Sequence, residues 1–155
     1  MDELSLIFRL ILATGLGALV GFERERSHKV AGLRTHALVA LGSALFAIIS
    51  ISGGLLQIDN SNIDPLRVVS NIVVGIGFIG AGSILRRGNR VEGTTTAASL
   101  WTVAAIGAAT GLGLYFASVF TAIVVYIVLT FLWRLEKSVV DKVRYEDDND
   151  NGEDQ

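Results

Sequence analysis

The sequence predicts an all-α protein, a polytopic transmembrane helix bundle of about five spans. Of its 155 residues, 51% are hydrophobic and 18% charged, and the mean hydropathy of +0.54 is higher than a single soluble core requires. The charged residues are separated by long apolar runs, and a bilayer core of ~30 Å is crossed by roughly 20 apolar helical residues. These runs are apolar around the whole helix rather than along one stripe, which argues against a soluble bundle.

Four charge-poor runs define the spans. The first three, near 4–22, 36–58 and 68–85, are interrupted only by Arg9. The last run, 93–133, would reach about 60 Å as one helix, about twice the membrane thickness. We expect it to turn at Gly111-Leu112-Gly113, since two glycines favour a tight turn, and so to form spans near 95–111 and 114–133.

The domain organisation follows from these spans. Residues 1–133 are predicted to be one transmembrane domain, and residues 134–155 a cytoplasmic tail that is acidic and disordered at its end. The first segment begins Met1-Asp2-Glu3 and lacks both a basic start and a small-residue cleavage site. We therefore interpret it as a retained helix and not as a signal peptide.

The basic residues predict the orientation. Eleven of the thirteen Lys and Arg residues lie in three segments, 24–34, 86–90 and 134–144. Short loops rich in Lys and Arg stay in the cytoplasm. The N-terminus is therefore predicted outside and the C-terminus inside, which agrees with an odd number of spans.

The overall charge and the cysteine count exclude several classes. The net charge of -2 does not indicate a nucleic-acid partner. A chain with no cysteine cannot form disulfides or thiolate metal sites. No catalytic pair can be assembled from the spans, so we expect no enzyme and no cofactor.

Small residues recur at helical spacing and predict close helix contacts, because small side chains let helix backbones approach one another in lipid. The segment 75–80 also matches the dinucleotide fingerprint G-x-G-x-x-G, but that motif requires a soluble βαβ unit, whereas here it lies inside a predicted span. We assign helix packing to Gly17, Gly21, Gly75, Gly77, Gly80, Gly82, Gly107 and Gly111.

A cluster of charged residues is predicted in one short cytoplasmic loop beside a helix end, where opposite charges should pair. The cluster is either a positive-inside anchor or a docking or ion-sensing site. The basic loop 86–90 is expected on the same face, with Glu92 as a further acid. The candidate residues are Glu23, Arg24, Glu25, Arg34 and His36, together with Arg26.

Polar residues within the spans are the other candidates. Asn71 needs a partner or a water-filled cavity if it lies in lipid. The run Thr94, Thr95 and Thr96, with Ser99, could cap its helix or form a functional surface beside Trp101. Capping is the simpler interpretation.

Three further features have simple interpretations. Arg9 lies early in its span, where it can extend to the outer surface or pair with Asp59 or Asp64. Those two acids could hold a hydrated Mg²⁺, although solvation is the usual role of such residues. The tail segment 147–152 opens like an EF-hand loop but lacks the final glutamate and a second helix, which favours a solvated tail.

Four segments of the sequence resemble motifs of the MgtC/SapB family and occur in the order and at the spacing of that family. They are residues 17–25, 31–39, 76–85 and 93–101, written GALVGFERE, AGLRTHALV, IGFIGAGSIL and GTTTAASLW. The resemblance covers roughly residues 5 to 115. Many members carry a soluble domain after the last span, and we expect only the membrane part here.

The resemblance implies a bacterial inner-membrane protein that supports growth under magnesium limitation and that, in pathogens, is associated with virulence. It favours a non-catalytic regulator of another membrane complex or of membrane energetics. The alternative is a small transporter or channel for Mg²⁺ or another cation. Membrane lipid and a protein partner are expected, a homo-oligomer is an alternative, and Mg²⁺ binding is left open.

Overall fold

The computed structural model describes residues 2–52, 65–88 and 90–131. These residues form five helices: α1 (Glu3–Arg26), α2 (Leu33–Ser52), α3 (Pro65–Gly82), α4 (Thr94–Gly111) and a last helix, Tyr115–Phe131. Two short strands, β1 (Leu85–Arg87) and β2 (Arg90–Glu92), form an antiparallel hairpin that pairs Leu85 with Glu92 and Arg87 with Arg90. The predicted all-α class is confirmed, with this hairpin as an addition that the sequence analysis did not include.

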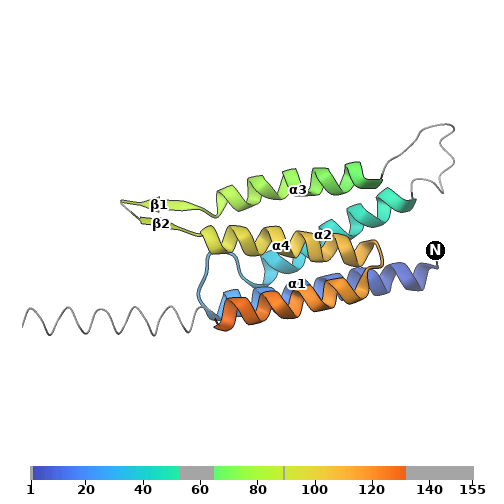
Figure 1. The fold of residues 1–155 in the computed structure, drawn as a ribbon, viewed down its shortest axis with the longest axis horizontal. Helices are drawn as coiled ribbons and strands as arrows, with labels where there is room; N and C mark the ends of the chain where they lie inside the picture. Colours follow the sequence, from blue (N-terminus) through green and yellow to red (C-terminus); the bar gives the residue numbers. More distant parts are fainter. Residues whose placement is uncertain (1, 53–64, 89, 132–155) are drawn as a thin grey trace, which may run out of the picture.

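The helices lie side by side and alternate in direction along the chain (Figure 1). The α1–α2 connection and the hairpin lie at one end of the bundle, which we call the hairpin end. The N-terminus and the turn after α4 lie at the opposite end. The basic segments 24–34 and 86–90, predicted on the same face, therefore do lie at the same end.

Several helix bounds differ from the expected spans. Helix α1 continues to Arg26, and α2 begins at Leu33, so the charged cluster occupies two helix ends rather than a loop. Helix α3 ends at Gly82 instead of continuing to residue 85, because the chain turns there into the hairpin. The ends of the predicted spans at 53–58 and 132–133 fall outside the described residues.

The predicted turn at Gly111-Leu112-Gly113 is confirmed. Gly113 has a left-handed φ of 87°, which favours glycine. Its N–H donates to the carbonyl of Thr110 over 3.0 Å, and the N–H of Leu114 donates to Ala109 over 2.9 Å. These two bonds form the Schellman motif that ends many helices, so the turn satisfies carbonyls that α4 leaves free.

Glycines bring α1, α2 and α4 into backbone contact. A Cβ added at Gly17 would lie 2.6 Å from the Cβ of Ala40, and one at Gly21 would lie 2.7 Å from the Cα of Leu33. Added Cβ atoms at Gly107 and Gly111 would overlap the backbone carbonyls of α2 at Ala40 and Ala44. The prediction of close packing is therefore right for all four glycines.

Three glycines of α3 make no such contact with the described residues. An added Cβ at Gly75, Gly77 or Gly82 has no other atom of the described chain within 4 Å. Gly80 faces Ala97 of α4 at 3.5 Å, an ordinary contact that does not require glycine. Helix α3 thus lies against α4 at Gly80, and its other glycines are open.

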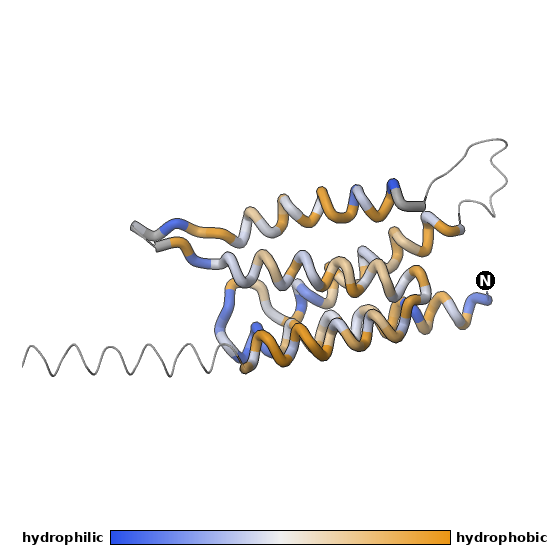
Figure 2. Tube along the Cα trace, viewed as in Figure 1, coloured by the Kyte–Doolittle hydropathy of each residue, from blue (hydrophilic) through white to orange (hydrophobic). Residues whose placement is uncertain are grey.

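Small, polar and aliphatic side chains fill the bundle, and many large apolar side chains are exposed on its outside. Buried residues include Ala13, Ala40 and His36, whereas Phe116 is 86% and Phe78 80% exposed. Figure 2 shows hydrophobic residues along the length of the helices, with hydrophilic residues mainly near their ends and connections. Helices α1 and α2 are long and apolar enough to cross a membrane, and Arg67–Gly82 and Tyr115–Phe131 are shorter apolar helices. This distribution suits a lipid surrounding, where helices gain from close contact between small residues.

Candidate functional site

Two residues of the predicted cluster form a buried ion pair at the hairpin end. The Arg24 guanidinium donates a hydrogen bond to the Glu23 carboxylate and forms a salt bridge with it. Both residues are buried from solvent. The Ser27 hydroxyl donates to the second Glu23 oxygen over 2.8 Å. A buried carboxylate with partners at both oxygens keeps its charge compensated inside the protein.

Glu25 holds the connection between α1 and α2. Its Oε2 accepts a hydrogen bond from the backbone N–H of Leu33, the first residue of α2, over 3.0 Å. The same carboxylate leaves no room for a Cβ at Gly32. Glu25 is exposed. Its carboxylate therefore accepts this hydrogen bond and also lies at the protein surface.

His36 joins α2 to α4. Its Nδ1 lies 2.8 Å from the Gly32 carbonyl, and its Nε2 lies 3.0 Å from the Ser99 hydroxyl oxygen. A carbonyl can only accept, so Nδ1 carries a hydrogen. The Ser99 hydroxyl also lies 2.8 Å from the Thr96 carbonyl. In neutral His36 the hydroxyl donates to Nε2; in the charged form it accepts from Nε2–H and donates to Thr96.

The structure thus brings His36, Ser99 and Thr96 together, although the sequence analysis selected them separately. The ion pair Glu23–Arg24 lies at the same end of the bundle as this trio. Thr95 and Trp101 are exposed and take no part in the trio's hydrogen bonds. The residues selected from sequence therefore divide into a buried polar cluster and an exposed set.

The prediction that threonine hydroxyls cap α4 is wrong. The N-cap residue is Gly93, with a left-handed φ of 92°, and no side-chain cap hydrogen bond forms there among the described residues. A Cβ at Gly93 would overlap the Ser83 carbonyl, because the hairpin returns the chain close to the end of α3. The helix start is therefore set by the hairpin geometry instead of by a hydroxyl cap.

Arg9 makes contacts that the sequence analysis missed. It donates from Nη1 to the Gly111 carbonyl over 2.6 Å and from Nε to the Tyr115 hydroxyl over 3.1 Å. Its guanidinium also lies 5.8 Å from the centre of the Tyr115 ring. A cation at the C-terminal end of α4 is favoured by the helix dipole. The signal in the sequence was a lone arginine on the same predicted side of the membrane as the turn at Gly111–Gly113. The last carbonyls of a helix have no partner within that helix.

The described residues contain no group of three or more His, Asp or Glu side chains that could hold a metal ion. Asp59, Asp64 and the tail segment 147–152 lie outside the described residues.

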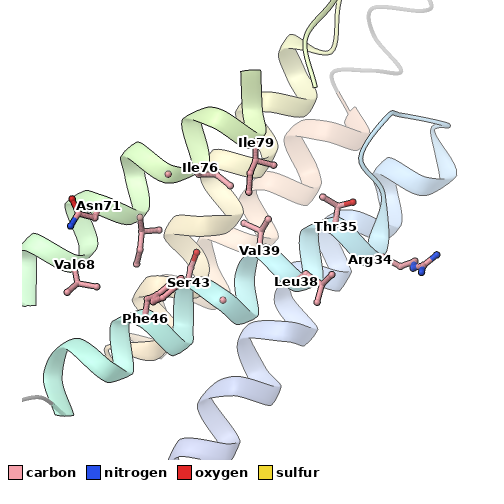
Figure 3. A pocket seen from close by; sticks show the side chains of 13 residues that line it. Arg34, Thr35, Leu38, Val39, Ser43, Phe46, Val68, Asn71, Ile76 and Ile79 are labelled. Carbon is pink, nitrogen blue, oxygen red and sulfur yellow. The ribbon is translucent and has the colours of Figure 1, made fainter. Parts of the chain in front are cut away.

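A groove of about 920 Å³ opens between α2 and α3 (Figure 3). Arg34 and Thr35 lie at one end of it, and Asn71 and Val68 lie toward the other. Apolar side chains form most of the walls between these ends. Asn71 is exposed and lines the groove, which is where the structure places this predicted polar residue.

A helix bundle with small residues at its backbone contacts and many large apolar residues on its outside is typical of an all-α membrane protein. The chain belongs to the MgtC family, which it matches over residues 10–138. The predicted family is therefore confirmed.

Relatives from three bacteria are similar to the chain. It is 42% identical to the Escherichia coli (strain K12) protein named "Putative magnesium transporter YhiD", over 88% of this chain and 64% of that protein. It is 50% identical to Protein MgtC of Brucella abortus, over 64% of this chain and 39% of that protein. Protein SrpB of Synechococcus elongatus is 45% identical, over 74% of this chain and 67% of SrpB. The chain spans less than two thirds of the first two relatives, and no solved structure matches it.

Proposed function

We propose that this chain is a multi-pass protein of the bacterial inner membrane that supports adaptation to low magnesium. In this proposal it regulates another membrane complex or membrane energetics and catalyses no reaction. Membership of the MgtC family and the magnesium-related name of YhiD support a magnesium-related role. The apolar outside of the bundle supports a membrane location.

One observation favours regulation over transport: in the described helices, the charges that are buried or partly buried are bound to each other or to a helix end. Glu23 pairs with Arg24 near one end, and Arg9 bonds to the end of α4 at the other. Between them, glycine contacts close α1 against α2 and α2 against α4. A cation path needs oxygen ligands along its length, since Mg²⁺ gives up its water reluctantly.

The hairpin end offers a surface for a protein partner. Exposed charges of both signs, including Glu25, Arg26, Lys29 and Arg86, lie at this end of the bundle. Such a surface can recognise a partner by charge complementarity. We place this end in the cytoplasm because basic connections are retained there.

The orientation is tested with a reporter enzyme that is active only outside the cytoplasm. Fused before Asp2, the reporter is expected to be active; inserted at Gly88 in the hairpin, it is expected to be inactive. The two sites lie at opposite ends of the bundle, so one reporter serves as the control for the other. Activity at Gly88 with none at Asp2 would reverse the orientation.

Transport is tested with purified protein in liposomes. We expect no Mg²⁺ flux above that of empty vesicles, as measured with an internal magnesium-sensitive dye. A magnesium channel of known activity is the positive control. Saturable flux that is lost in Asn71→Leu would contradict regulation and favour the transporter, because Asn71 lines the groove between α2 and α3.

Regulation is tested in cells with Glu25→Gln. Glutamine keeps an oxygen that can accept the Leu33 N–H bond but removes the charge. We expect loss of growth at low magnesium with normal protein levels in the membrane. Glu3→Gln, an exposed acid in the first turn of α1 at the opposite end, is the matched control and should grow normally. Equal growth of both variants would contradict a docking role for the charge.

A further inference from the structure

The groove between α2 and α3 is apolar along its length and charged at one end. Leu38 and Phe46 of α2 and Ile72 and Ile79 of α3 are among the apolar residues that line it. Gly42 and Gly75 also line it, and a Cβ at either glycine would meet no other described atom within 4 Å. The missing side chains therefore widen a slot between two helices that could otherwise be filled.

The length of the groove fits one leaflet of a bilayer. From Arg34 to Phe46 the helix rises by about 18 Å, at about 1.5 Å per residue. One leaflet of the hydrocarbon core is about 15 Å deep, half of ~30 Å. An acyl chain that enters at the Arg34 end would thus end near the middle of the membrane.

The positive charge at one end of the groove favours a ligand with an anionic headgroup. Arg34 is exposed and lines the groove, and among the described residues it forms no salt bridge. Arg26 and Lys29 add exposed positive charge at the same end. A guanidinium binds phosphate through two parallel hydrogen bonds, and basic groups at a membrane surface attract anionic lipid.

We propose that this groove is a binding site for one anionic phospholipid of the leaflet at the hairpin end. Arg34 binds the phosphate, and one acyl chain lies between α2 and α3, over Gly42 and Gly75. The site goes beyond the regulatory function proposed above and requires only that the bundle lies in a membrane. It also gives Gly75, one of the α3 glycines without a close helix contact, a role in the groove.

The proposal is tested by native mass spectrometry of the full chain in mild detergent with added phosphatidylglycerol or phosphatidylethanolamine. We expect one phosphatidylglycerol to bind, with a clear preference over phosphatidylethanolamine. Arg34→Gln should lower phosphatidylglycerol affinity roughly tenfold, the effect of losing a charge-assisted hydrogen bond, and should abolish the preference. Lys29→Gln, which removes a nearby charge outside the groove, should retain most of the preference.

The apolar part of the site is tested with a matched pair on α3. Gly75→Leu fills the groove and should abolish the bound lipid, whereas Gly77→Leu, also in open space but outside the groove lining, should retain it. Circular dichroism should show equal helix content in both. Equal lipid binding by the two variants would overturn the proposal. So would a photo-crosslinker at Ile72 that captures a second copy or another protein instead of lipid.

Magnesium-limited growth and liposome flux do not depend on this result. A chain that binds no lipid but fails to grow with Glu25→Gln would keep the regulatory proposal and refute the lipid site. Lipid binding together with normal growth of Glu25→Gln would keep the lipid site and refute the regulatory proposal.

Discussion

Gly107→Ala is expected to lower the free energy of unfolding by about 3 kcal/mol, the upper part of the usual range for overpacking. The new methyl group would lie 2.8 Å from the Cα of Ala40 and would overlap its carbonyl oxygen. Backbone atoms of α2 cannot turn aside as a flexible side chain can. Helices α2 and α4 would therefore have to separate along their shared contact.

Gly77→Ala is the matched control, because it is the same substitution inside a neighbouring helix where the added methyl meets nothing. Alanine favours a helix over glycine by roughly 0.5–1 kcal/mol, so this variant should be unchanged or slightly more stable. Both values can be measured by reversible unfolding in mixed detergent micelles with circular dichroism as the signal. Equal stability of the two variants would refute the assigned backbone contact between α2 and α4.

Arg24→Met is expected to cost about 3–5 kcal/mol, because it leaves the buried Glu23 carboxylate without its cation. Methionine keeps much of the apolar volume of arginine, so the loss reports charge compensation more than packing. Glu23 is 5% and Arg24 2% exposed, so water cannot replace the missing partner.

Two comparisons isolate the ion pair in Arg24→Met. Arg26→Met, an exposed arginine in the same helix turn, should change stability by less than about 0.5 kcal/mol. The double variant with Glu23→Gln should be more stable than Arg24→Met alone, since it removes the uncompensated charge. A double variant that is less stable than either single variant would show that the two side chains act independently.

Much of the fold could be predicted because the signals were long or strongly spaced. Charge-free runs identified the helical segments, and two glycines placed the turn at Gly111–Gly113. The paired glycines of α1 and α4 indicated their close contacts, since a four-residue spacing places small residues on one helix face. Spacing alone could not show which face of α3 has a neighbour, and among its glycines only Gly80 contacts another described helix.

The candidate site was predicted as a set of residues and not as a set of contacts. His36 and Ser99 lie 63 positions apart, and no local pattern indicates that α2 and α4 meet there. The hairpin after Gly82 was missed because its strands are three residues each, too short for an alternating pattern to appear. Its return places Gly93, which has no side chain, at the N-cap of α4.

The contact of Arg9 with Gly111 and Tyr115 joins the first helix to the last turn and the last helix described, 102 and 106 positions later. During synthesis the arginine therefore enters the membrane long before its acceptors exist. A chain that has not yet made Tyr115 lacks the hydroxyl group and the ring that contact Arg9, so its first helix is held less firmly. We expect nascent chains truncated at Gly111 to be degraded faster than chains extended to Phe131, and Arg9→Leu to reduce that difference in a pulse-chase measurement.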